Sequence, residues 1–307
     1  MTLKVSDIGE KELIKYIIAN CKSITPDDCA ITNFDNSNLI STSDMLIQSR
    51  HFPDVMSYFE MGFKAVTVNV SDLAAMGAEP LVFLLAIAMP KDLEVDSFKQ
   101  IISGVINACE YYEIPLVGGD TNEASEIIIS GTALGTADNP VMKNTYNKGD
   151  LIALTGNIGH AALGFELNKL DNFYTVKSLK PKARLKEALI LKDFASSMTD
   201  ITDGLASELY EIKKDNYGFM IYEEMLNITD EYKEIACKLN MNYLDLILYF
   251  GEDFELLFTI SSKNLEKLPI DCIVIGEVTD SDIVELTLEN GFIETIENKG
   301  YEHYVSE

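Results

Sequence analysis

Apolar residues recur along the chain at two different spacings, and each spacing predicts a different element. Positions three or four residues apart follow one face of a helix, whereas continuous or alternating apolar runs are typical of strands. In the first half, helices are predicted over residues 10–20, 56–78 and 93–112. Strands are predicted over residues 38–41, 81–89, 114–117 and 126–136. The run over residues 81–89 is entirely apolar, so we expect a strand buried on both faces.

The second half of the chain alternates strands and helices in the same way. Strands are predicted over residues 151–155, 218–222, 254–260 and 272–278, and helices over residues 160–168, 183–196 and 204–215. Turn-forming residues cluster between the halves, over residues 137–140 and 147–150. We therefore predict an α/β (α+β) chain of two domains, with residues 1–138 in the first and 139–307 in the second.

Acidic residues strongly outnumber basic ones. The 307 residues include 24 Lys and Arg against 50 Asp and Glu, which gives a formal net charge of −26. A surface of this kind repels phosphate backbones and anionic lipids, so we expect neither nucleic acid nor membrane as a partner. The 47 % of hydrophobic residues argues against a disordered chain. The open question is whether all the acids are solvated surface or some of them gather to hold metal.

Cysteine usage predicts a reducing, cytoplasmic compartment. Five scattered cysteines without a C-x-x-C motif argue against disulfides and zinc knuckles. The N-terminal residues do not resemble a signal peptide, and no apolar run reaches the roughly 20 residues of a membrane span. Arg50 and Arg184 are the only arginines, so a phosphate site must depend on lysine, backbone N–H groups or metal.

The common nucleotide-binding motifs are absent, and a different pattern recurs. The chain has no Walker A loop, no G-x-G-x-x-G and no protein-kinase signature. Instead, apolar runs end in short polar segments that carry acids: Asp44, Asp72, Asp120, Asp200 with Asp203, and Glu252 with Asp253. Strand ends of an α/β sheet share one edge, where these carboxylates would converge and require cations. Oxygen ligands favour Mg²⁺, and Mg²⁺ in turn suggests a phosphate-bearing substrate.

Each segment taken alone also has a structural explanation. Asp203 is equally well explained as the cap of the helix near Leu205, and the pair at residues 27–28 as a solvated turn. The glycines at 118–119 suit a tight turn. The segment over residues 155–160 is better explained as an ordinary turn between strand and helix than as a phosphate-binding loop.

Six segments in order along the chain resemble the thiamine-monophosphate kinase family of the aminoimidazole-ribonucleotide-synthetase-like ATP-binding superfamily. They are Asp-Asp-Cys-Ala at 27–30, Ser-Asp-Met-Leu at 43–46 with His51, the helix segment at 62–78, Gly-Gly-Asp-Thr at 118–121, Asp-Ile-Thr-Asp-Gly-Leu at 200–205 and Gly-Glu-Asp-Phe-Glu-Leu at 251–256. The 62–78 segment is shared across the superfamily. The segments at 43–51, 200–205 and 251–256 are more specific to this kinase family.

The resemblance implies a two-domain fold, with an N-terminal dimerising and ATP-binding domain and a C-terminal α/β domain that completes the cleft. It implies a homodimer that transfers a phosphoryl group in line from ATP to thiamine monophosphate, with several Mg²⁺ ions. The implied metal ligands are Asp27, Asp28, Thr42, Ser43, Asp44, Asp72, Asp120, Asp200 and Asp203. The implied ATP contacts are Gly118, Gly119, Asp120, Lys143 and Thr202. The implied substrate contacts are His51, Glu252, Asp253 and Tyr301, and the catalytic acids are Asp44, Asp72, Asp120 and Asp203.

The chain departs from the family pattern at a few positions. Lys143 stands where the family often has an arginine, and His160 stands where it has an acid. These departures concern individual ATP contacts and leave the reaction class unchanged. Two alternatives stay open: another ATP-dependent enzyme similar to aminoimidazole ribonucleotide synthetase, and a non-catalytic nucleotide- or Mg²⁺-binding protein.

Overall fold

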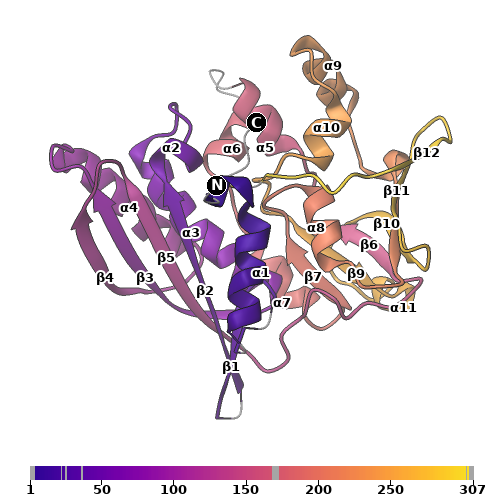
Figure 1. The fold of residues 1–307 in the computed structure, drawn as a ribbon, viewed down its shortest axis with the longest axis horizontal. Coiled ribbons are helices and arrows are strands. Elements are labelled where there is room, and N and C mark those ends of the chain that lie inside the picture. The colour runs from indigo at the N-terminus through magenta and orange to yellow at the C-terminus, as the bar shows by residue number, and fades with distance from the viewer. Residues whose placement is uncertain are drawn as a thin grey trace.

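The computed structural model describes residues 4–21, 23–24, 26–35, 37–167, 173–301 and 303. These residues form two α/β units, each built on one β-sheet (Figure 1). Residue 168, where one predicted helix ends, lies outside the described residues. The two-unit α/β architecture predicted from the sequence is confirmed, and the predicted boundary after residue 138 falls in the connection between the two sheets.

The N-terminal unit is a five-stranded sheet with two long helices on one face. Its elements in order are η1 (Val5–Asp7), α1 (Glu10–Asn20), β1 (Ala30–Phe34), β2 (Ser37–Ile47), α2 (Gln48–His51), α3 (Tyr58–Ala75), β3 (Glu79–Met89), α4 (Val95–Tyr111), β4 (Leu116–Glu123) and β5 (Ile128–Ala137). The strand order is β1-β2-β5-β3-β4, and only β3 and β4 run parallel. The predicted helices over 10–20, 56–78 and 93–112 are confirmed as α1, α3 and α4.

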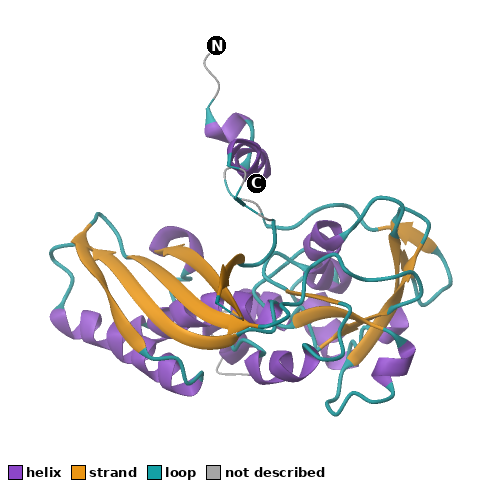
Figure 2. Cartoon of the chain, turned by 90° about the horizontal axis from the view of Figure 1, so that it is seen from below, coloured by secondary structure: helices purple, strands orange, loops and turns teal. Residues whose placement is uncertain are grey.

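Both long helices, α3 and α4, lie on the same side of this sheet, and neither covers its other face (Figure 2). The expectation that residues 81–89 are buried on both faces is therefore wrong. In β3, Phe83, Leu85 and Ile87 are buried, whereas Leu81 is 45 % exposed and Ala86 is exposed. The apolar run in β3 reflects one buried face and one uncovered face.

Helix α3 is the centre of the molecule. Ser57 and Glu60 form a capping box at its start, which satisfies backbone N–H groups that have no partner within the helix. Most of its residues are buried, because α3 lies between the N-terminal sheet and the elements α7 and β7 of the second unit. A helix that is apolar nearly all round is stable only when it is covered on all sides. One hydrophobic cluster consequently runs from the first unit into the second.

The C-terminal unit is a seven-stranded sheet of order β12-β11-β8-β10-β6-β9-β7. Its strands are β6 (Leu151–Leu154), β7 (Ser197–Asp200), β8 (Gly218–Tyr222), β9 (Leu256–Ile260), β10 (Ile273–Thr279), β11 (Val284–Thr287) and β12 (Ile293–Thr295). Its helices are α5 (His160–Leu167), α6 (Phe173–Leu179), α7 (Leu185–Leu191), α8 (Leu205–Ile212), η2 (Glu223–Met225), α9 (Asp230–Lys238), α10 (Tyr243–Leu248) and α11 (Ser262–Leu265). A second hydrophobic cluster fills this unit.

Helix α1 stands away from both sheets (Figure 2), and none of its residues is buried. Glu10 at its start accepts a hydrogen bond from the backbone of His303 at 3.0 Å, so the beginning of α1 meets the C-terminal segment. No helix within the described ranges is long and apolar enough to cross a membrane.

Candidate active site

A cleft of about 1490 Å³ lies between the two units. Residues of β2, α2 and α3 form one side, and the other side comes from the loops before α8 and β9 and from the C-terminal segment. Among the residues predicted from the sequence, those that line the cleft are Ser43, Asp44, His51, Asp72, Thr202, Asp203, Glu252 and Tyr301. The cleft therefore gathers predicted site residues from both halves of the chain.

The predicted acids that line the cleft or lie beside it are not all carried by segments that follow strands. Ser43 and Asp44 lie inside β2, and Asp72 lies in the last turn of α3. Asp200 ends β7, and Asp203 follows it. The expectation that strand ends alone deliver these carboxylates to one edge is wrong for Asp44 and Asp72. Helix α3 lies across the sheet and brings Asp72 to the middle of β2 instead.

Hydroxyl groups hold the carboxylates of what we call the acidic cluster (Asp28, Asp44, Asp72 and Asp200). Thr42 Oγ1 donates a hydrogen bond to Asp72 Oδ2 at 2.5 Å. Ser71 Oγ donates to Asp200 Oδ2, which joins α3 to the second unit. Burial raises the pKa of Asp44, and its interaction with the carboxyl group of Asp72 partly offsets this increase. The cluster is therefore a set of oxygen atoms held close together by both units.

Burial raises the pKa of each carboxyl in the acidic cluster. It raises the pKa of Asp28 to about 7 and that of Asp200 to about 6. The pKa of Asp72 is raised well above its ordinary value by burial and then by the charges of Asp44 and Asp200. Like charges this close cannot all remain ionised unless protons or cations neutralise them.

The donor set of the acidic cluster suits a hard cation. Within the described ranges, no three carboxyl, thiol or imidazole groups already surround one point as metal ligands. The carboxylate oxygens of the acidic cluster instead contact hydroxyl and ammonium groups. One of them, Asp28 Oδ2, is buried without any hydrogen-bond partner. A buried carboxylate oxygen that lacks a partner, beside several other oxygens, is the chemistry that Mg²⁺ accepts.

Lys143 lies at the edge of the acidic cluster. Its Nζ is 2.7 Å from Asp28 Oδ1 and 3.0 Å from Glu211 Oε2, and its backbone N–H donates to Asp27 Oδ2 at 3.3 Å. Burial lowers the pKa of Lys143, but the charges of Asp28 and Glu211 outweigh it and raise the pKa above its ordinary range. Lys143 and Asp27 therefore contact the acidic cluster. Neither residue is among those that line the cleft.

Backbone hydrogen bonds pair two of the sequence motifs with each other. The N–H of Glu252 donates to Thr202 O at 2.9 Å, and the N–H of Phe254 donates to Ile201 O at 3.0 Å. At Gly251, a Cβ atom would lie only 1.7 Å from Thr202 O, so no other residue fits. The motifs at 200–205 and 251–256 therefore form one continuous wall of the cleft.

Glu208 orients this wall, although it lies outside the sequence motifs. It is buried, and its Oε1 accepts hydrogen bonds from the N–H groups of Asp203 at 3.1 Å and Thr202 at 3.4 Å. Burial and the neighbouring Glu211 raise the pKa of Glu208, and they also raise that of Asp203 to about 7. An acid on the inward face of a predicted helix is the sequence signal that could have found it.

Two of the predicted substrate contacts, His51 and Glu252, meet at Lys64, a residue to which the sequence motifs assign no role. Its Nζ donates to His51 O at 2.9 Å and forms an ion pair with Glu252 Oε2. Burial lowers the pKa of His51, whose Nδ1 accepts a hydrogen bond from Ile47 N at 2.8 Å. Tyr301 lines the same cleft and is 48 % exposed. A lysine inside an otherwise apolar helix was the available signal for Lys64.

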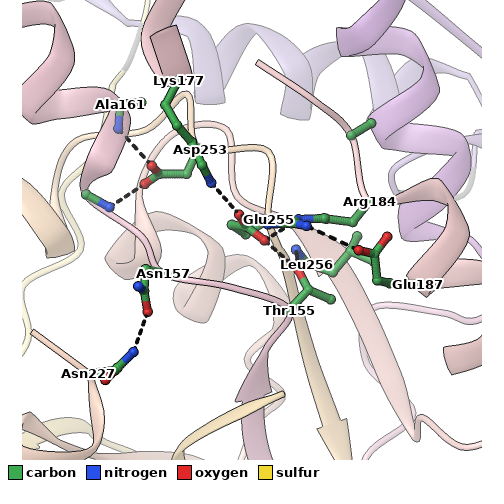
Figure 3. Close-up of polar contacts among 12 residues, drawn as sticks. Thr155, Asn157, Ala161, Lys177, Arg184, Glu187, Asn227, Asp253, Glu255 and Leu256 are labelled. Atoms are coloured by element: carbon green, nitrogen blue, oxygen red, sulfur yellow. Dashed lines mark hydrogen bonds and ion pairs between the residues drawn. The ribbon is translucent and has the colours of Figure 1, made fainter. Parts of the chain in front are cut away.

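Asp253 points away from the cleft, unlike its neighbour Glu252. It accepts hydrogen bonds from Gly159 N at 2.6 Å and Ala161 N at 3.0 Å, at the start of α5 (Figure 3). Burial raises the pKa of Asp253 to about 7. A carboxylate of the chain therefore occupies N–H groups of the turn over residues 155–160, which agrees with the structural explanation of that turn rather than with a phosphate-binding loop.

Glu255 anchors the same loop from behind the cleft. Arg184 donates to it from both Nε and Nη2 at 2.6 Å, Lys177 Nζ at 3.0 Å and Thr155 Oγ1 at 2.8 Å (Figure 3). The side chain of Glu255 is only 1 % exposed. Burial alone would raise its pKa, but Arg184 and Lys177 hold it below the ordinary value. Glu255 is therefore ionised and fully paired.

The predicted ATP contacts on β4 lie apart from this cleft. Gly118, Gly119 and Asp120 belong to the outer edge strand of the N-terminal sheet, and all three are exposed. None of them is among the residues that line the cleft.

The register of the sheet shows how far Asp120 is from the acidic cluster. Asp120 pairs with Ala86, Ala86 pairs with Ser130, and Ser130 pairs with Met45. Cross-strand partners project from the same face, so Asp120 and Met45 share the uncovered face and Asp44 projects from the other. Three strand spacings of about 4.8 Å separate Asp120 from β2 by roughly 14 Å. Within one chain, Asp120 and Asp44 do not meet.

Comparisons with known proteins cover nearly the whole chain. Residues 26–137 match the family model of the AIR synthase related protein N-terminal domain, and residues 147–289 match that of its C-terminal domain. The chain is 38 % identical to the thiamine-monophosphate kinase of Pyrococcus abyssi over 282 residues, which cover 90 % of this chain and 89 % of the relative. It is 34 % identical to that of Pyrococcus horikoshii over 305 residues, 97 % of each chain. The solved structure of AaThiL complexed with AMPPCP and TMP has a TM-score of 0.90 at 29 % identity and covers 99 % of both chains.

Proposed function

This chain belongs to the AIR synthase related family and, within it, to the thiamine-monophosphate kinases, and we propose that it transfers the γ-phosphoryl group of ATP directly to thiamine monophosphate. The product is thiamine diphosphate. The acidic cluster beside a cleft between the two units carries this proposal, because a group of carboxylate oxygens suits Mg²⁺, on which phosphoryl transfer depends. The similar structure AaThiL was solved with AMPPCP and TMP, which supports both substrates.

We assign several Mg²⁺ ions to the acidic cluster. The residues that would hold them are Asp27, Asp28, Thr42, Ser43, Asp44, Asp72, Asp200 and Asp203. When bound, Mg²⁺ would neutralise the charge on the transferred phosphoryl oxygens and screen the two substrates from each other. The unpartnered Asp28 Oδ2 and the raised pKa values of the cluster support this assignment, because a cation would replace the protons that otherwise neutralise it.

The residues around the cluster divide between the two substrates. Lys143 and Thr202 are assigned to ATP, since they lie beside Asp28 and Asp203 respectively. His51, Glu252 and Tyr301 are assigned to thiamine monophosphate, because they line the cleft and stand where the family resemblance implies contacts to this substrate. The attacking group is a phosphate oxygen that is already anionic at neutral pH, so no strong general base is required. Catalysis consists of holding the two substrates in line in a space that excludes water.

We further propose that the chain acts as a homodimer through the uncovered face of the N-terminal sheet. Exposed apolar residues on this face include Met45 of β2 and Ala86 of β3, which are both cross-strand partners of Ser130. Apolar side chains on an uncovered sheet favour a second copy as cover. Asp120 lies on β4, the edge strand of this sheet, and projects from the uncovered face. In the dimer its carboxylate, with Gly118 and Gly119, would therefore complete the ATP and metal site of the partner subunit.

A cytoplasmic location agrees with this function. ATP is a substrate of the intracellular compartment, and all five cysteines of the chain are free thiols.

The proposal is tested by incubating the purified chain with ATP, Mg²⁺ and thiamine monophosphate and separating the products. Thiamine diphosphate is expected to form in amounts equal to ADP, and chelation of Mg²⁺ should stop the reaction. A parallel assay with the substrate of aminoimidazole ribonucleotide synthetase covers the alternative enzyme, which the relatives described above do not favour. ATP hydrolysis without thiamine diphosphate would overturn the assignment.

A further inference from the structure

Lys64 is a buried cation at the wall of the cleft. It lies in α3 among Gly62, Phe63, Ala65 and Val66, and its side chain is only 1 % exposed. Lysine is seldom buried unless it is paired, so a lysine at this position requires a specific partner. Lys64 is nevertheless among the residues that line the cleft, which places its ammonium group at the boundary between core and substrate space.

The partners of Lys64 come from two distant parts of the chain. Its Nζ donates to the backbone oxygen of His51 at 2.9 Å, and this residue ends α2 in the N-terminal unit. It also forms an ion pair with Glu252 Oε2, in the loop before β9 of the C-terminal unit. One ammonium group therefore contacts both sides of the cleft, at two of the three residues assigned to thiamine monophosphate.

Glu252 needs this partner because its surroundings are unusual. Its backbone φ is 70°, a left-handed conformation that costs a residue with a side chain free energy unless neighbours hold it. The Oε2 atom is buried and lacks a partner with hydrogen-bond geometry, so Lys64 supplies only charge to it. The side chain is 28 % exposed, so its remaining part reaches the cleft.

We propose that Lys64 is a positioning residue for the phosphoryl acceptor. It holds one oxygen of Glu252 so that the rest of the carboxylate faces the cleft, and it holds the end of α2 so that His51 keeps a constant separation from Glu252. This inference rests on the proposed function, since the acceptor is thiamine monophosphate. Lys64 acts through Glu252 and His51, and it does not need to touch the substrate itself.

The electrostatic consequence of removing the ammonium group is specific to the acceptor side. Without Lys64, Glu252 Oε2 is an uncompensated buried charge, and its carboxylate turns toward water in the cleft. The hydrogen bond to His51 O is lost at the same time. Within the described residues, neither the acidic cluster nor Lys143 nor Thr202 forms a hydrogen bond or ion pair with Lys64, so the ATP side keeps its geometry.

The test compares steady-state kinetics of Lys64→Met, Lys64→Arg, Glu252→Gln and the double variant Lys64→Met with Glu252→Gln. We expect Lys64→Met to raise the KM for thiamine monophosphate by about 30-fold, in line with the loss of one partner of a buried charge pair. The KM for ATP should change by less than about threefold, and Lys64→Arg should recover most of the loss. A merely structural role would lower stability and leave the ratio of the two KM values unchanged.

The double variant separates positioning from direct binding. If Lys64 acts through Glu252, the combined increase in KM should be at least about fivefold smaller than the product of the two single increases. A combined increase equal to that product would overturn the proposal. If Lys64→Met does not fold, the double variant, which lacks both charges, is compared with Glu252→Gln alone. A small additional loss is expected from the hydrogen bond to His51 O, whereas an additional increase in KM of about 30-fold would overturn the proposal.

Lys192→Met is the matched control. Lys192 follows α7 and pairs with Glu79 of β3 at 3.0 Å, so it also joins the two units, but neither residue lines the cleft. The KM values of Lys192→Met for thiamine monophosphate and for ATP are expected to match those of the wild type. If the proposed function is wrong, the wild-type chain forms no thiamine diphosphate. If only this inference is wrong, the wild type is active and Lys64→Met has the same KM for thiamine monophosphate.

Discussion

The hydroxyl of Ser71 donates a hydrogen bond to the carboxylate of Asp200, across 129 positions of the chain. Ser71 lies in the buried helix α3 of the first unit, and Asp200 ends β7 of the second. The bond places the acid at the end of β7 next to Asp72, the neighbour of Ser71 in sequence. The acidic cluster therefore exists only when the two units are docked, and the site and the interface between the units are the same structure.

Replacing Asp72 by Asn should abolish turnover without loss of the fold. The pKa of Asp72 is raised by burial and by Asp44 and Asp200, so a neutral isostere removes a charge that the metal-free protein tolerates poorly. We expect kcat/KM to fall by about 10³-fold while thermal stability is unchanged or higher. Product assays and thermal melts of Asp72→Asn and Asp44→Asn measure this. Near-normal rates in either variant would contradict the role of the cluster.

The stability of the metal-free protein should decrease as the pH rises. Burial raises the pKa of Asp28 and Asp203 to about 7 and that of Asp200 to about 6, each from an ordinary value of 3.8. A raised carboxyl pKa means that the folded state binds protons more tightly. The contribution of each such carboxyl group to stability is complete below its pKa in the unfolded state, and it is lost as the pH rises toward about 7.

Melting temperatures of chelator-treated protein measured from about pH 5 to about pH 8 should therefore fall, and added Mg²⁺ should reduce the slope. The variant Asp203→Asn should show a shallower slope than the wild type, which separates this effect from general repulsion by the net charge of −26. A melting temperature that rises through this window without metal would contradict the raised pKa values.

Removing Arg184 should destabilise the fold, because Glu255 is nearly fully buried and ionised. Arg184 donates to Glu255 twice at 2.6 Å (Figure 3), and Lys177 alone cannot replace both bonds. We expect Arg184→Met to lower the free energy of unfolding by about 3 kcal/mol, and the double variant with Glu255→Gln to recover part of it. Urea denaturation measures both.

The control for this prediction is Glu187→Gln. Glu187 accepts from Arg184 Nη1 at 3.1 Å but is half-exposed, so its loss should change the free energy of unfolding by less than about 1 kcal/mol. Equal effects of Glu187→Gln and Arg184→Met would show that the buried ion pair contributes no more to the free energy of unfolding than the exposed one.

Mixing two inactive variants should restore activity if Asp120 completes the site of a partner subunit. Asp44→Asn and Asp120→Asn are each expected to be inactive as homodimers. A mixed dimer contains one site with both native acids, since Asp44 and Asp120 of one site would come from different chains. Rates measured after the variants are mixed and allowed to exchange should rise well above those of either variant. No recovery, although mixed dimers form, would place both acids of a site on one chain.

Much of the fold follows from local sequence. The helices α3 and α4 and the strands β3, β5 and β6 are confirmed where the apolar spacing predicts them, because backbone periodicity is set by neighbours along the chain. Short elements were not predicted, among them β1, β7 and the helices α2, α6 and α10, since a few residues carry too little periodicity to be distinguished from loop. The uncovered face of β3 was also missed, because an apolar run does not reveal which face is covered.

The sequence by itself determined the two-unit α/β chain, the recurrence of acids in short polar motifs and the family to which these motifs belong. Only the tertiary structure decided which of these acids meet. Adjacent residues diverge, as Glu252 faces the cleft whereas Asp253 caps α5. Distant residues converge, as Lys64 meets Glu252 and Ser71 meets Asp200. The physical reason is that periodicity depends on short-range backbone geometry, whereas the partners of a charge depend on how α3 is buried between two sheets.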